Sequence, residues 1–383
     1  MLNNVTGLID ITLRSQQPQK VTIQANRPLQ AARLLIGKTP QQALDIIPLL
    51  FNICGTAQAY TALQAISQQQ ALTQEPTQQS ARELLVLTET AKEALLRIFL
   101  DWPRLCSLST TDTADLRYVA QLNKNFSQIL FQQGQAFLLH STLNTDATEQ
   151  TTHFIDTLEQ FLVEHIFQMP LIHWLQLQNN TLQHWAKHTD TLAAQSLHYF
   201  YKNNWQAQGA VDCRPLPHLD EQALLSALHS ENAAQFIAWP QWQQHCYEST
   251  ALSRQLQQTL VQNVYQHYAG SLLTRWVARL AELATIPAQM RQIGQKTVAS
   301  QHHLGIAQTE AARGRLIHYV DIQAGIISRY QILAPTEWNF HPQGLLAQSL
   351  AQLKSKNAQQ LQHLADLMVH IFDPCVAYQI KVT

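Results

Sequence analysis

The segment Asp373–Thr383, DPCVAYQIKVT, decides which fold we predict, because its cysteine has a counterpart near the opposite end of the chain. Asp373 is a favourable N-cap residue, and Pro374 suits the first position of a helix, where its missing N–H needs no partner. The segment therefore predicts a helical turn that begins at Asp373. Cys375 would lie in the first turn, where the helix dipole and the free N–H groups favour a thiolate over a thiol.

The composition indicates a mainly α (α+β) protein. Hydrophobic residues make up 46% of the 383 residues and charged residues 13%, and there are only 11 glycines. Few glycines together with abundant Gln, Leu and Ala favour helices. The net charge of −1 gives no field that would attract nucleic acid or an anionic membrane. We find neither a signal peptide nor an apolar run long enough to span a bilayer, so we expect a cytoplasmic protein without membrane insertion.

Local patterns predict small β elements near both ends of the chain. Alternating apolar and polar residues indicate two β-hairpins, one formed by 7–13 and 21–24 and one by 314–322 and 326–333. Thr39 and Pro40 carry a helix-start signature, and Pro48 should kink or end that helix. A later helix, at about 356–372, leads to the cysteine segment.

Apolar residues at three-and-four spacing predict a bundle of long helices between these ends. The predicted helical stretches are 80–102, 114–137, 150–167, 180–202, 220–237 and 245–283. Pro103 should end the first of them, and the segments 203–218 and 284–296, which contain Pro and Gly, should be loops. We expect one domain over 1–383, made of a hairpin (1–26), a helical body (27–296) and a last part (297–383) with a hairpin, a helix and the cysteine segment.

Cys54 lies at the start of another predicted helix and is the electrostatic counterpart of Cys375. Each could be a small buried hydrophobe, or the two could form a thiolate pair for a soft or borderline metal, and their separation in the sequence does not decide between these interpretations. Cys106, Cys213 and Cys246 are expected to be packed, inert thiols. The scattered cysteines contain no C-x-x-C pair and argue against a disulfide framework.

Two other groups of titratable residues are interpreted as surface features. His184 and His188 share a helical face, but Trp185 stands where a zinc protease needs a glutamate, so we predict ordinary surface histidines. Glu89, Glu93 and Arg97 follow one another at intervals of four residues, so they share one face of the predicted helix. We interpret them as a solvated ladder of ion pairs.

The third group contains hydrogen-bond donors. Arg313 precedes Gly314 at the start of a predicted strand, where its guanidinium can project a rigid fork toward an anion. Thr336 follows Pro335 and offers a fixed hydroxyl. Alone, these features would be a salt bridge and a turn.

Taken together and in this order, the motifs resemble the large subunit of nickel–iron hydrogenases over 5–66 and 297–382. Cys54–Ala57 resembles the first C-x-x-C of that family, and Cys375–Lys381 resembles its closing C-x-x-C-x-x-H. Arg313 and the Pro335–Asn339 segment resemble the parts that hold the cyanide ligands of the iron. The resemblance implies a long-helix bundle with small β-hairpins near both ends.

The sequence departs from this family where the enzymes need bridging ligands. Ala57 and Tyr378 stand in place of the second cysteine of each pair, and Lys381 replaces the closing histidine. The proton-relaying glutamate falls at Thr6. A methyl group and a phenol cannot replace two bridging thiolates. We therefore expect neither a complete nickel–iron centre nor an enzyme.

What remains is similar to the HupK/HoxV-type hydrogenase accessory proteins. That resemblance implies a scaffold in hydrogenase maturation that transiently holds an iron–carbonyl–cyanide precursor. Cys54 and Cys375 would bind the iron, while Arg313, Pro335 and Thr336 would contact its cyanides. The implied partners are maturation chaperones and the hydrogenase large subunit. The alternative is a metal-free pseudo-subunit that acts as a protein-binding partner or chaperone.

Overall fold

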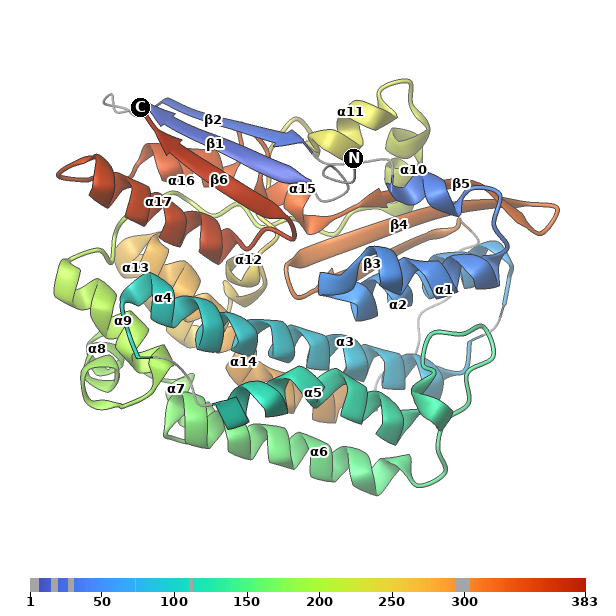
Figure 1. The fold of residues 1–383 in the computed structure, drawn as a ribbon, viewed down its shortest axis with the longest axis horizontal. Coiled ribbons are helices and arrows are strands. Elements are labelled where there is room, and N and C mark those ends of the chain that lie inside the picture. The colour runs from blue at the N-terminus through green and yellow to red at the C-terminus, as the bar shows by residue number, and fades with distance from the viewer. Residues whose placement is uncertain (1–6, 15–19, 27–30, 73, 110–112, 294–303) are drawn as a thin grey trace.

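The computed structural model describes residues 7–14, 20–26, 31–72, 74–109, 113–293 and 304–383. Within them the chain forms a large helical body and two three-stranded sheets (Figure 1). The predicted fold class, mainly helical with small β elements near both ends, is confirmed. None of the helices in these ranges is long and apolar enough to cross a membrane.

The first sheet joins the two ends of the chain. Strands β1 (Leu8–Arg14) and β2 (Lys20–Asn26) pair antiparallel, which confirms the predicted hairpin. Strand β6 (Ala377–Val382) adds to β1 in parallel, so that Ile11 lies opposite Ile23 on one side and Ile380 on the other. Alternate side chains of β1 are buried, and this apolar face fixes the register of the sheet.

The second sheet contains the other predicted hairpin and one strand more. Strands β4 (Gly314–Gln323) and β5 (Ile326–Leu333) form the hairpin, and β3 (Ile306–Ala311) pairs with the free edge of β4. Helix α1 (Pro40–Leu50) begins at the predicted position, since Thr39 caps it. It continues two residues past Pro48. A short 3-10 turn (Asn52–Cys54) leads from α1 to α2 (Gly55–Gln69), which packs against β3 and β4.

Most of the helical body lies on one side of both sheets, whereas its part from 221 to 238 lies on the other side of the second sheet, near β5 (Figure 1). Its helices are α3 (Pro76–Leu96), α4 (Trp102–Cys106), α5 (Thr113–Leu130), α6 (Ala147–Leu162), α7 (Leu171–Trp174), α8 (Asn179–His188), α9 (Leu192–Asn203), α10 (Glu221–His229), α11 (Ala233–Ala238), α12 (Ala251–Gln255), α13 (Thr259–Tyr268) and α14 (Leu272–Ile293). After the second sheet come α15 (Pro335–Asn339), α16 (Leu345–Ala351) and α17 (Ala358–Phe372). Helix α14 is buried on nearly all sides and packs against α3, α6, α12, α13 and α17, so it forms the centre of the bundle.

Several predicted boundaries in the body are wrong. Pro103 does not end a helix, because a π turn (Arg97–Asp101) joins α3 to α4 and the proline lies in the first turn of α4, where it needs no N–H partner. The described part of the predicted loop 284–296 is helical, since α14 continues through Pro287 to Ile293 and its packing outweighs the proline. The stretch 245–283 contains three helices rather than one, and the stretches 180–202 and 220–237 contain two each. The loop predicted after α9 is confirmed.

Candidate metal and ligand cavity

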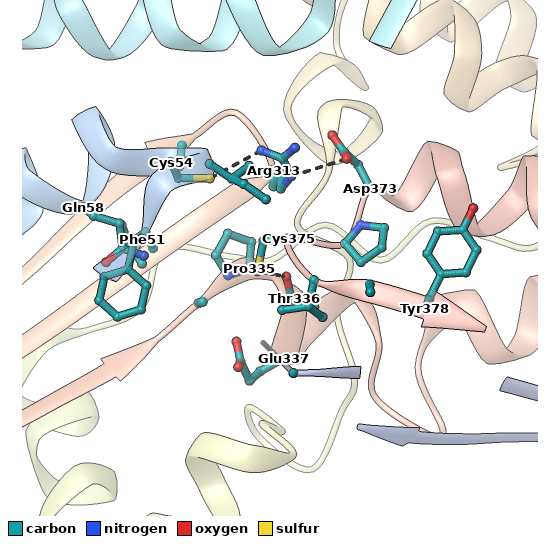
Figure 2. A pocket seen from close by; sticks show the side chains of 18 of the residues that line it. Phe51, Cys54, Gln58, Arg313, Pro335, Thr336, Glu337, Asp373, Cys375 and Tyr378 are labelled. Carbon is teal, nitrogen blue, oxygen red and sulfur yellow. Dashed lines mark hydrogen bonds and ion pairs between the residues drawn. The ribbon is translucent and has the colours of Figure 1, made fainter. Parts of the chain in front are cut away.

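A cavity of about 890 Å³ lies where the two sheets, α2 and the end of α17 meet. All five site residues that the sequence predicts line it: Cys54, Arg313, Pro335, Thr336 and Cys375. They come from segments that are far apart in the chain (Figure 2). The fold therefore brings the predicted set together in one place.

Cys54 is the N-cap residue of α2 and is 9% exposed. The Arg313 guanidinium donates a hydrogen bond from Nη1 to its sulfur at 3.4 Å. Burial raises the pKa of the Cys54 thiol to about 12, against the opposing effect of Arg313. The expectation that the helix N-terminus favours a thiolate here is therefore wrong for the protein without a bound cation.

A carboxylate from α3 already occupies the N-terminus of α2. Glu89 accepts hydrogen bonds from the backbone N–H groups of Thr56 and Ala57 at 2.8 and 2.9 Å. These are N–H groups that a Cys54 thiolate would otherwise use. Burial also raises the pKa of Glu89. The interpretation of Glu89 as part of a solvated ladder is wrong, because its side chain is buried against α2.

The other two members of that ladder also face the interior. Glu93 accepts a hydrogen bond from Arg313 Nη2 at 3.1 Å, and Arg97 forms ion pairs with Asp101 at 2.8 Å and Asp373 at 2.9 Å. The four-residue spacing placed the three side chains on one face of α3 correctly. That face turns toward the protein interior instead of water, and Arg97 also lines the cavity.

Asp373 is the centre of a buried ionic network. Its carboxylate lies 2.9 Å from Arg97 Nη2, 2.9 Å from Arg279 Nη1 and 3.3 Å from Arg313 Nε. Burial alone would raise the pKa of Asp373, but the three arginines outweigh it and hold the pKa well below its usual range. The residue therefore keeps its charge in the folded protein.

The predicted helical turn at Asp373 is wrong. This residue ends α17 in the left-handed conformation (φ 57°, ψ 73°), and its N–H donates to the carbonyl groups of Val369 and His370. Pro374 cannot continue the helix, and β6 follows three residues later. Cys375 therefore lies in a connector and not in the first turn of a helix.

Gly314 allows the close approach that places Arg313. Its φ is +126°, and a Cβ atom there would lie 1.8 Å from the carbonyl oxygen of Ser249. Asn339 of α15 donates to the carbonyls of Ser249 and Arg313 at 2.9 and 3.2 Å. These contacts hold the backbone at the start of β4, so the position from which the Arg313 side chain extends is fixed.

Thr336 provides the second predicted donor. It follows Pro335 in the first turn of α15, and its Oγ1 lies 3.1 Å from the sulfur of Cys375 (Figure 2). Cys375 is half-buried, unlike Cys54. Each thiol in the cavity thus has its own polar neighbour, one charged and one neutral.

The residues at the positions of the missing ligands are used for structure. Tyr378 points away from the two sulfurs, and its hydroxyl donates to Asp366 of α17 at 2.5 Å (Figure 2). Ala57 is buried, and Lys381 is exposed on β6. Thr6 lies outside the described residues. Neither Ala57 nor Tyr378 offers a ligand to a bridged bimetallic centre.

Across the described ranges, no group of three or more His, Cys, Asp or Glu side chains is arranged to hold a metal ion. His184 and His188 are exposed on α8 as predicted, with His188 Nδ1 2.8 Å from the carbonyl oxygen of His184. Cys106 and Cys246 are buried and Cys213 is half-buried. A metal that was held by the two thiols alone would need the rest of its coordination from elsewhere.

Comparison with known proteins defines the class. The family model for nickel-dependent hydrogenases matches residues 227–380. The nickel–iron–selenium hydrogenase of D. vulgaris Hildenborough superimposes with a TM-score of 0.65 over 93% of each chain at 14% identity. That of Desulfomicrobium baculatum gives 0.63 over 93% of this chain and 94% of the other, at 13% identity. The chain therefore has the fold of the nickel–iron hydrogenase large subunit.

Curated relatives show which proteins with this fold the chain resembles over most of its length. Hydrogenase expression/formation protein HoxV of Cupriavidus necator is 28% identical over 94% of this chain and 92% of its own length. Hydrogenase expression/formation protein HupK of Azotobacter vinelandii is 27% identical over 98% of this chain and 97% of its own. The uptake hydrogenase large subunit of Rhizobium leguminosarum bv. viciae is 38% identical, but over only 20% of this chain and 14% of its own. The resemblance to HupK/HoxV-type proteins is thus confirmed.

Proposed function

We propose that this protein is an accessory protein in nickel–iron hydrogenase maturation, and that its cavity transiently holds an iron–carbonyl–cyanide precursor as cargo. The names of its relatives support the accessory role. The observation that carries the cargo proposal is the convergence of two thiols and two hydrogen-bond donors, from 54, 313, 336 and 375, on one cavity.

The ligand set suits a metal that brings most of its own ligands. Two thiols are too few for an ordinary structural metal site, which has four protein ligands. An iron that already carries carbonyl and cyanide needs fewer ligands from the protein. Cys54 and Cys375 would supply soft sulfur ligands, and Arg313 and Thr336 would donate hydrogen bonds to cyanide nitrogens. Arg313 also places a positive charge beside the anionic cyanides.

The protonation of Cys54 fits a cargo that arrives and leaves. A thiol must lose its proton to bind a metal, and burial holds the pKa of Cys54 at about 12. The charge of an incoming iron favours the thiolate, and departure of the iron restores the thiol. With Ala57 and Tyr378 at the bridging positions, no second pair of sulfurs would retain the metal. We therefore expect reversible holding and no hydrogen turnover.

Infrared spectroscopy tests the cargo proposal directly. The full chain is purified anaerobically from a host that has the maturation machinery, beside the variants Cys54→Ala and Cys375→Ala. We expect carbonyl and cyanide bands in the wild-type protein and their loss in both variants. Cys106→Ala is the matched control, since it removes a buried thiol outside the cavity, and it should keep the bands. Absent bands in the wild type, with unchanged hydrogenase maturation in a Cys54→Ala strain, would refute the proposal.

One observation favours the metal-free alternative. Arg313 already contacts Glu93, Asp373 and Cys54, so its guanidinium is engaged without any cargo. In that case the network is a purely structural core, and the protein acts by binding maturation chaperones or the hydrogenase large subunit. Cys54→Ser and Cys375→Ser would then leave maturation intact, whereas the cargo proposal expects both to abolish it.

A further inference from the structure

Gln58 lines the same cavity but has no role in the site described so far. It lies on α2, four residues after Cys54, so the two side chains are one helical turn apart on the same face. Its side chain is 6% exposed, and Figure 2 shows it on the cavity side of α2 next to Phe51. A buried amide in such a position requires partners for both its oxygen and its nitrogen.

A buried histidine binds one end of this amide. His318 Nε2 lies 2.8 Å from Gln58 Oε1, and His318 Nδ1 lies 2.7 Å from the hydroxyl of Tyr330. His318 and Tyr330 belong to the neighbouring strands β4 and β5, and both are buried. The three side chains form a continuous hydrogen-bonded chain from the sheet to the cavity.

The direction of the hydrogen bonds in this chain follows from Tyr330. Among the described residues its hydroxyl has no acceptor other than His318 Nδ1, and a buried O–H without an acceptor is costly. Tyr330 therefore donates to Nδ1, which leaves the ring proton on Nε2, and Nε2 donates to Gln58 Oε1. Burial lowers the pKa of His318 to about 3, so the ring stays neutral and this direction holds near neutral pH.

The amide nitrogen of Gln58 is left for the cavity. Because its oxygen is bound to His318, Nε2 is the polar atom of this side chain that remains for the cavity, which Gln58 lines. No acceptor for Nε2 is found in the part of the chain that the structure describes. The surrounding wall is largely apolar, with Phe51, Ile332 and Leu316 among its members. A hydrogen bond donated in such surroundings competes little with water.

We propose that Gln58 is a specificity-determining residue of the cavity, whose amide N–H donates to an acceptor atom of the bound ligand. Resting on the proposed function, that acceptor is the nitrogen of a metal-bound cyanide, and Gln58 is a third donor beside Arg313 and Thr336. It selects a ligand with an acceptor one helical turn from the metal-bound sulfur of Cys54. It also disfavours a purely apolar ligand, which would leave the amide unpaired.

The test uses the full chain and the variants Gln58→Met and Gln58→Glu. Methionine keeps the size of the side chain and removes the donor, and glutamate replaces the donor by an acceptor. Gln121→Met, on the exposed face of α5, makes the same chemical change outside the cavity. Thermal unfolding followed by circular dichroism identifies any variant that fails to fold.

In the loaded protein we expect Gln58→Met to shift one cyanide band and Gln121→Met to shift none. Bands that are present in the wild type and unmoved by Gln58→Met and Gln58→Glu would overturn the inference and leave the proposed function intact. Absent bands in the wild type would instead count against the proposed function alone.

Thiocyanate, a linear anion with a terminal nitrogen acceptor, then tests Gln58 without a metal. We expect it to bind the wild type, with an affinity that Gln58→Met weakens roughly 2- to 10-fold, the effect of one hydrogen bond. Gln58→Glu should weaken it more, and Gln121→Met should leave it unchanged. Equal affinities for wild type and Gln58→Met, or no binding to the wild type, would overturn the inference.

Discussion

Replacing Asp373 by asparagine removes the negative charge at the centre of the arginine network and keeps the size of the side chain. Arg279 and Arg313 are almost fully buried, and Arg97 is about one-quarter exposed. Removing one partner of a buried ion pair costs about 3–5 kcal/mol, because the remaining charge stays uncompensated. We expect Asp373→Asn to lower the free energy of unfolding by about 4 kcal/mol, with the two buried arginines responsible for most of it.

Urea unfolding at pH 7, followed by circular dichroism, measures this loss. With an unfolding entropy of ~2.1 cal/mol/K per residue, 383 residues give about 0.8 kcal/mol/K, so Tm should fall by about 5 °C. Asp156→Asn is the control, because it breaks a pair with Arg291 of similar length (2.7 Å) between side chains that are 58% and 42% exposed. That change should cost less than ~1 kcal/mol. An Asp373→Asn loss no larger than the control would refute the network as a source of stability.

Three further predictions concern a thiol, a histidine and a glycine. Because burial raises the pKa of Cys54 to about 12, iodoacetamide at pH 8 should modify this thiol far more slowly in the folded chain than in urea. Peptide mass spectrometry measures both rates, and similar rates would contradict the prediction. Burial lowers the pKa of His370 to about 3. Below pH ~6.5 this histidine therefore binds a proton in the unfolded chain but not in the folded chain. The free energy of unfolding should decrease as the pH falls from ~6.5 to ~3. His370→Gln should reduce the slope of the unfolding free energy against pH by the contribution of one proton, ~1.4 kcal/mol per pH unit. If urea midpoints show the same slope in the variant and the wild type, His370 is not the group responsible. Gly314→Ala should lower the free energy of unfolding by ~2–4 kcal/mol, because the new Cβ atom would clash with Ser249. Gly325 also has a positive φ but has open space around it, so Gly325→Ala should cost only ~1 kcal/mol. Equal losses for the two variants in urea unfolding would rule out the clash.

Features that depend on neighbouring residues were predictable from the sequence. Thr39 caps α1 as its spacing to Gln42 indicates, because both hydrogen bonds of that cap lie within three residues. The β4–β5 hairpin is fixed by its own alternation and a short turn. The meeting of Cys54 and Cys375 at one cavity was also predictable, whereas their role as metal ligands stays a prediction. The expectation that these two cysteines meet came from the family resemblance and not from local chemistry.

Features that depend on distant partners were not predictable. Glu89 and Glu93 have the spacing of a solvated ladder, and only the fold supplies partners 33 and 220 residues away. Asp373 fits an N-cap as well as a C-cap position. Its actual position is stabilised by arginines from the π turn after α3, from α14 and from the turn between β3 and β4. Gln58 gave no signal at all, because its partner His318 is 260 residues distant. Buried polar groups are paired through tertiary structure, which periodicity does not reveal.

The pairing of β6 with β1 has a consequence for the order of events during synthesis. Asp10 of β1 and Gln379 of β6 are neighbours across the sheet but are separated by 369 residues. At ~5–20 residues per second, a ribosome needs roughly 20 to 70 s between making these two positions. Over that interval β1 has no parallel neighbour, and Cys375, the second thiol of the cavity, has not yet been made. The cavity can therefore form only after Cys375 and β6 have been translated, so its two walls cannot assemble in the order in which the chain is made.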